Sequence, residues 1–234
     1  SLPDMPPALP VYTFITPEMN DEYAGRIAQS LGFHGDLVPL ANKEARQVYS
    51  YIDGDDVLEI NLTGSLTVFR DTVFSENTAT ISDEAFIDAA QNWLSAIGLP
   101  KNNTPIEITP YMANEKIILA KTVKLNTDIA GYAVIGAGAS ITVQNDGKII
   151  NARVYYPELK EYRTENLIKT EQALELLKIC LTSPVANSPE AKVCRINMRS
   201  FSRLIITSVS VKYVINGQFV LPVFVFEGDA IDDF

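Results

Sequence analysis

The chain has 234 residues but only one histidine and two cysteines. Most metal sites and nucleophile–histidine arrangements need further residues of these types, so the composition excludes most such designs. Clustered lysine and arginine are also missing, since 19 basic residues stand against 29 acidic ones, a net charge of −10. Nucleic-acid binding neutralises phosphates with clustered basic side chains, so this balance disfavours nucleic acid as a partner.

Long apolar runs are absent as well. No stretch approaches the ~18 uncharged apolar residues of a membrane-spanning helix, although 47% hydrophobic residues make the chain too apolar to be disordered. The length fits one or two domains with a core. The first seven residues, Ser-Leu-Pro-Asp-Met-Pro-Pro, hold three prolines and no apolar signal core. We therefore expect a truncated or mature form without its targeting segment, beginning with a linker or a tether from a membrane anchor.

Catalytic motifs are missing too. No Gly-x-Ser-x-Gly or Walker loop occurs, and Gly136-Ala137-Gly138-Ala139 lacks the third glycine of a dinucleotide fingerprint. His34 follows a helix stop and is interpreted as a loop residue without function. Two acidic clusters, at 53–56 and 227–233, do not match a calcium-binding loop and are interpreted as a solvated hairpin tip and a charged tail.

Cap and turn signals are strong in the first half. Strand patterns cover residues 11–15, 47–52, 57–62 and 65–70. One helix is predicted from a cap at Thr16 to Gly32, and another from Ser82 to Gly98. The proline- and asparagine-containing segment 101–110 is predicted to join two domains, 1–104 and 105–234.

The second half is richer in strand patterns, which are predicted at 116–125, 130–136, 139–144, 148–156, 204–215 and 219–226. Asn216-Gly217 is the strongest hairpin signal of the chain. A third helix is predicted from Thr170, whose cap sequence echoes that at Ser82. We therefore expect an α+β fold: two similar units, with antiparallel sheets each covered by a helix.

The two cysteines, Cys180 and Cys194, lie fourteen positions apart across a segment with two prolines. In an oxidising compartment, a disulfide here would close a ~15-residue loop and contribute about 3 kcal/mol. The alternative is two free cysteines, one of them on the core face of a helix. With His34 distant, the cysteines do not complete a zinc site, so neither a metal nor a cofactor is expected.

Three stretches are similar to a known group of proteins. They are the turn 145–149 leading into Tyr155-Tyr156-Pro157, the helix that begins at Thr170, and the strand 209–213 followed by Leu221-Pro222-Val223-Phe224-Val225-Phe226. Together they resemble the exported PepSY-like modules and the YycH/YycI-type regulators of Gram-positive envelope sensor kinases, over roughly residues 116–226. The resemblance implies an exported, membrane-tethered bacterial protein that binds or restrains a partner and catalyses nothing.

Aromatic strand residues are the candidate binding residues. Tyr155 and Tyr156 are adjacent, so their side chains should point to opposite faces and one should be exposed. Phe219, Pro222 and Phe224 share one strand, in which Pro222 indicates an edge or a bulge. An exposed aromatic beside an open edge suits peptide capture by strand addition, although Pro222 could instead guard the edge against aggregation.

We therefore predict a non-catalytic extracytoplasmic module, acting on a protein or peptide of the cell envelope. The alternative is an envelope hydrolase or ligand-processing enzyme that uses acidic residues, which would need two carboxylates facing each other across a cleft.

Overall fold

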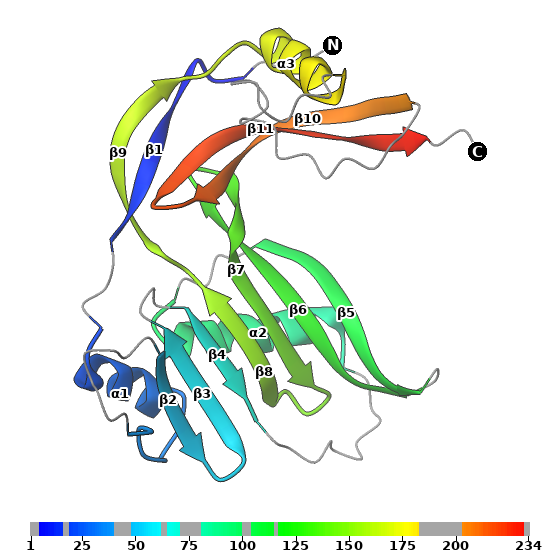
Figure 1. Cartoon of the computed structure of the whole chain (residues 1–234). Coiled ribbons are helices and arrows are strands. Elements are labelled where there is room, and N and C mark those ends of the chain that lie inside the picture. The colour runs from blue at the N-terminus through cyan, green and yellow to red at the C-terminus, as the bar shows by residue number, and fades with distance from the viewer. Residues whose placement is uncertain are drawn as a thin grey trace. The chain divides into compact units, whose positions relative to one another are not determined.

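The computed structural model describes residues 5–15, 19–39, 48–61, 65–70, 81–99, 104–114, 117–182 and 203–231. Strands hold 59% of the described residues, which also form three helices (Figure 1). The chain divides into two compact units: a larger one, Phe14–Lys160, and a smaller one that combines Ser1–Thr13 with Glu161–Phe234.

The predicted α+β fold is wrong. The described residues are mostly β-sheet with three short helices, and the two units differ in size and in the number of helices described in each. The prediction gave the helix caps more weight than the strand patterns, because a cap is recognised from a few adjacent residues whereas strand pairing is not. The division of the chain also falls at Thr13/Phe14 and Lys160/Glu161 and not between residues 104 and 105.

The larger unit is built on a sheet with the spatial order β2-β3-β4-β8-β7-β6-β5, in which each neighbouring pair is antiparallel. These strands are β2 (Val48–Asp53), β3 (Asp56–Asn61), β4 (Leu66–Phe69), β5 (Thr104–Asn114), β6 (Ile117–Ile129), β7 (Tyr132–Gln144) and β8 (Ile149–Tyr155).

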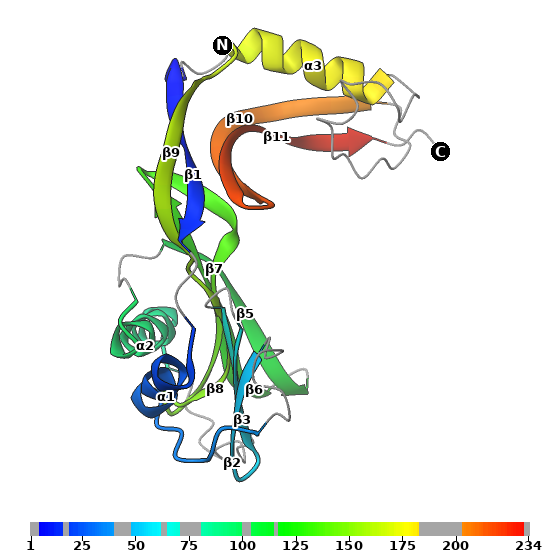
Figure 2. The same ribbon diagram turned by 60° about the vertical axis from the view of Figure 1, so that its left-hand side comes forward.

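Two helices, α1 (Asp21–Ser30) and α2 (Asp83–Ala96), lie on the same side of these strands (Figure 2). Ser82 caps α2 as predicted, accepting a 3.3 Å hydrogen bond from the Ala85 N–H. Helix α1 begins later than predicted: its cap is Asn20, which accepts from the Tyr23 N–H at 2.8 Å, while Thr16 lies outside the described residues. The helices and the facing side of the sheet share one apolar core that includes Ala24, Leu58, Phe86, Leu94, Val123 and Ile141.

The segment predicted as a domain linker is instead part of a strand. Residues 104–110 lie in β5, which pairs with β6 alone at the end of the sheet. Pro105 and Pro110 are tolerated there because an outermost strand needs hydrogen bonds on one side only. The prolines therefore led to the prediction of a linker at a position where the protein has an edge strand.

The smaller unit has strands in the order β10-β11-β1-β9. They are β1 (Ala8–Ile15), β9 (Glu158–Asn166), β10 (Arg203–Asn216) and β11 (Phe219–Ile231), of which β1 and β9 run past the unit boundary in sequence. The hairpin predicted at Asn216-Gly217 joins β10 to β11, with Gly217 at a φ of +61°. Helix α3 (Thr170–Thr182) begins at Thr170 as predicted. No helix in the described part of the chain has the length and apolar character needed to cross a membrane.

Candidate functional site

The face of the larger sheet that points away from α1 and α2, called the outer face here, carries many polar side chains. In β8, Ala152 and Val154 are buried, whereas Arg153 is exposed and Tyr155 is half-buried. Successive strand residues point to opposite faces. Arg153 and Tyr155 therefore belong to the outer face, opposite the helix-packed core.

The strand register aligns polar residues across this face. Arg153 lies opposite Thr67 of β4 on one side and opposite Ser140 of β7 on the other. Ser140 is in turn opposite Lys124 of β6, which is opposite Glu107 of β5. With Glu59 opposite Thr67, six neighbouring strands contribute one polar residue each to a single row.

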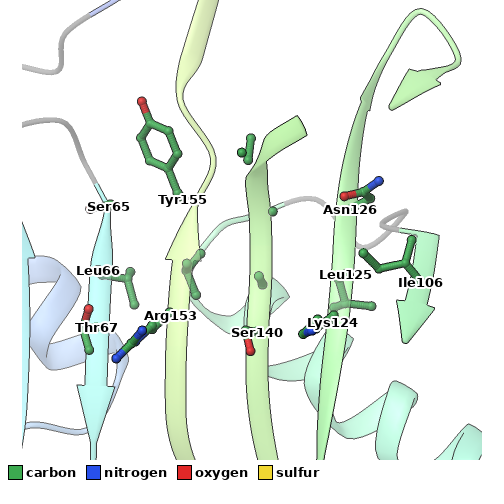
Figure 3. A pocket seen from close by; sticks show the side chains of 15 residues that line it. Ser65, Leu66, Thr67, Ile106, Lys124, Leu125, Asn126, Ser140, Arg153 and Tyr155 are labelled. Atoms are coloured by element: carbon green, nitrogen blue, oxygen red, sulfur yellow. The ribbon is translucent and has the colours of Figure 1, made fainter. Parts of the chain in front are cut away.

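A groove of about 400 Å³ crosses the outer face at this row, with walls contributed by β4, β5, β6, β7 and β8. In Figure 3, Arg153 and Lys124 lie on either side of Ser140, with Thr67 beyond Arg153. The next row places Gly138 between Tyr155 and Asn126. Gly138 has no side chain, which leaves the hollow between those two walls.

Gly138 is required by the close approach of two strands. A Cβ atom at this position would lie 2.2 Å from the carbonyl oxygen of Leu125, and its φ of +128° is one that other residues rarely adopt. The sequence Gly136-Ala137-Gly138-Ala139 was predicted to lie between two strands, but all four residues belong to β7. Glycine inside a strand marks a close backbone approach here, and with it the floor of the groove.

The groove is cationic. Its lining includes Lys124 and Arg153 but neither aspartate nor glutamate. Lys124 Nζ is 2.5 Å from Glu107 Oε2, and the hydrogen bonds from Lys124 and Thr109 hold the pKa of Glu107 below its ordinary value. The side chain of Arg153 has neither a hydrogen-bond nor an ion-pair partner among the described residues.

The other described arginines of this unit are paired: Arg26 with Glu22 and Arg70 with Asp56. Among the described residues of this unit, Arg153 is therefore the guanidinium group that the fold leaves available to a ligand.

The two predicted tyrosines point to opposite sides, as expected, but neither is fully exposed. Tyr155 lines the groove, and partial burial raises the pKa of its hydroxyl. Tyr156 packs against the core, where burial raises its pKa further. The Tyr156 hydroxyl is buried without a hydrogen-bond partner among the described residues. A binding partner in solution therefore cannot reach it.

The other predicted binding residues, Phe219, Pro222 and Phe224, lie on β11 in the smaller unit. Two of them make local aromatic contacts: Phe219 with Tyr162 at 5.3 Å between ring centroids, and Phe224 with Phe226 at 6.4 Å. These residues therefore do not belong to the groove that Tyr155 lines.

Pro222 lies at a change in strand pairing. It is opposite Tyr213 of β10, while the described register with β1 pairs Thr13 with Phe219 and Tyr12 with Val220. Continued by two residues, that register would set Pro10 against Pro222, and neither has an N–H to donate. The strand is therefore flanked on both sides at its start, where the prediction had placed an edge.

The other predicted features either have structural roles or lie outside the described residues. The His34 N–H donates to Asp53 Oδ2 at 2.9 Å, and Asp56 pairs with Arg70. The Cys180 side chain and the whole of Cys194 lie outside the described residues, so the disulfide stays a prediction. Within the described ranges, no group of three or more His, Cys, Asp or Glu side chains is placed to hold a metal ion.

Sequence reasoning missed Arg153, Lys124, Ser140 and Thr67. A usable signal existed for one of them, because Arg153 is a charged residue between the apolar Ala152 and Val154 in an alternating strand. An isolated charge in a half-buried strand is, however, equally typical of an ordinary solvated face.

Comparisons of the chain with protein-family models, curated proteins and solved structures gave no match.

Proposed function

We propose that this protein is a non-catalytic binding module of the bacterial cell envelope that holds a carboxylate-bearing segment of a partner protein on the outer face of its larger sheet. The observation that carries the proposal is the unpaired Arg153 in a groove that no carboxylate lines. In a chain with a net charge of −10, such a groove is a local exception to the overall repulsion of anions.

The chemistry of the groove suits a carboxylate. A guanidinium group binds a carboxylate through two parallel N–H···O hydrogen bonds. Thr67 and Ser140, directly opposite Arg153, supply hydroxyl groups that can donate to the same anion. Lys124 lies two strands away, or roughly 10 Å, and is already paired with Glu107, so Arg153 is the group expected to hold the anion.

The alternative, an acid-based hydrolase, finds no support in this groove. Such an enzyme needs two carboxylates across a cleft, and the groove lining contains cations and hydroxyl groups instead. The assignment to the cell envelope, with a membrane tether, rests on the resemblance to PepSY-like and YycI-type proteins.

The test is peptide binding measured by fluorescence anisotropy at low ionic strength. The probe is a fluorescein-labelled, amidated peptide with two glutamates separated by one serine, compared with the same peptide carrying glutamines. Charge-assisted hydrogen bonds contribute about 1.5–3 kcal/mol, so we expect the glutamate peptide to bind at least tenfold more tightly. Arg153→Gln should remove that advantage.

The matched control is Lys148→Gln, which removes the same charge from an exposed residue before β8 that does not line the groove. We expect it to change the affinity by less than twofold. Equal losses in both variants, or equal binding of the two peptides, would contradict a specific carboxylate site.

A further inference from the structure

A second feature of the outer face lies directly beside the groove. Ile52, Val57 and Phe69 stand opposite one another on β2, β3 and β4 and form a row that we call the apolar ledge. Ile52 and Phe69 are each 50% exposed, and Val57 is half-buried. Single exposed apolar side chains are ordinary, but a contiguous row on one face is typical of an interaction site.

The ledge is the row next to the polar row that crosses the groove. Phe69 follows Thr67 by two residues on β4, so both side chains point to the same face. Phe69 lies opposite Asn151, just as Thr67 lies opposite Arg153. The ledge and the arginine are therefore neighbouring rows of one surface within the larger unit.

We infer that one extended segment of the partner occupies both features, with a carboxylate at Arg153 and an apolar side chain on the ledge. This inference rests on the proposed function, because it assumes that the groove binds a carboxylate. It adds the conformation of the bound segment and the spacing of its two anchoring side chains.

The length of the groove suits an extended chain. Its walls come from five neighbouring strands, so it is about 19 Å long at roughly 4.8 Å per strand. An extended segment of about six residues spans that length.

The register also sets the spacing of the two anchors. Arg153 is one strand and one row away from Phe69, and two strands and one row away from Val57. These offsets correspond to roughly 8–12 Å, or two to four residues of an extended chain. Since alternate side chains of a strand share a face, the apolar residue should lie two or four positions from the carboxylate.

The test uses a series of amidated peptides with one glutamate and one leucine placed one to eight positions from it. We expect the affinity of the wild-type protein to rise about three- to tenfold for spacings of two and four, the gain expected from partial burial of a leucine side chain. Ile52→Ser and Phe69→Ser should remove this gain and leave the binding of a leucine-free peptide unchanged.

Ile135→Ser is the matched control, because Ile135 is 45% exposed on β7 and does not line the groove. The inference is overturned if no spacing improves binding, if the gain falls at seven or eight positions as a helix would require, or if the control variant loses the gain equally. If these results occur while Arg153→Gln still abolishes glutamate-dependent binding, the proposed function stands without the ledge. If Arg153→Gln has no effect, both fail.

Discussion

The two units of the molecule bury their apolar residues to different extents. Of the thirty buried apolar residues in the described part of the chain, six lie in the smaller unit: Leu9, Val11, Ala173, Val211, Tyr213 and Val220. The others belong to the larger unit, where α1 and α2 pack on the sheet. In the described residues, the larger buried core is therefore the one enclosed between two helices and one face of a sheet.

Helix α3 sharpens the contrast. Its buried residue Ala173 lies on one side, while Ile168 before it and Leu176 and Ile179 on it are 40–44% exposed. At 3.6 residues per turn, Leu176 lies about 60° and Ile179 about 120° around the helix from Ala173, so the exposed apolar stripe borders the packed one. The larger unit, by comparison, keeps Phe86, Ala90 and Leu94 of α2 fully buried.

The largest expected effect is the loss of a side chain from the core of the larger unit. Phe86 is fully buried in α2, so Phe86→Ala should lower the free energy of unfolding by about 3–5 kcal/mol. Trp93, the single tryptophan of the chain, lies on the same helix against the core. Its fluorescence during urea denaturation therefore reports the unfolding of this unit.

The comparison variant is Val211→Ala in the smaller unit, where Val211 is 6% exposed. Losing two methyl groups there should lower stability by about 2 kcal/mol and leave the Trp93 transition in place while circular dichroism detects the change. A Trp93 transition that moves as far for Val211→Ala as for Phe86→Ala would show that the two cores do not stabilise their units separately.

Glycines inside strands that approach a neighbouring strand closely should give the next largest effect, and we compare one from each unit. A Cβ atom would lie 2.2 Å from the Leu125 carbonyl oxygen at Gly138, and 2.0 Å from the Ile205 carbonyl oxygen at Gly228. Forcing the strands apart costs about 1–3 kcal/mol, and Gly138 adds the strain of a φ of +128°. We expect Gly138→Ala to lower stability more than Gly228→Ala does.

Gly131→Ala separates these two causes, because Gly131 has a φ of +84° but nothing within 4 Å of an added Cβ atom. It should cost about 1 kcal/mol from strain alone. Thermal denaturation of the three variants provides the measurement, and a Gly131 variant as unstable as Gly138→Ala would refute the steric explanation.

The smallest effect concerns two carboxylates, one in each unit. Hydrogen bonds from Lys124 to Glu107 and from Lys212 to Glu227 hold the pKa of each glutamate below its ordinary value of 4.5. A lowered pKa in the folded state means that the stabilisation is present above pH 4.5 and is lost as the pH falls through the folded-state pKa. Both groups are exposed, so salt should weaken the effect.

NMR titration of the side-chain carboxyl carbons measures both pKa values. Lys124→Met should raise the pKa of Glu107 toward 4.5, with only the Thr109 hydrogen bond still lowering it, and leave that of Glu227 lowered, whereas Lys148→Met should change neither. If the pKa of Glu107 does not rise in Lys124→Met, the ion pair is not a cause of its lowering.

Local structure was largely predictable from the sequence, because its signals act over a few residues. The Ser82 cap, the Asn216-Gly217 hairpin and the strands near residues 48 and 57 are where cap and turn chemistry placed them. Two local predictions were wrong for one reason. The prolines of β5 and the glycines of β7 were interpreted as breaks in structure, whereas an edge strand tolerates the first and a close strand contact requires the second.

The candidate site likewise has one part that the sequence determines and another that only the tertiary structure decides. Apolar alternation in β8 determines by itself that Arg153 points away from the core, since side chains alternate along a strand. Only the tertiary structure decides what surrounds Arg153, because Thr67 is 86 positions away and reaches it through the pairing of β4 with β8. Such long-range pairing depends on the burial of the whole sheet and has no signal in the residues that take part.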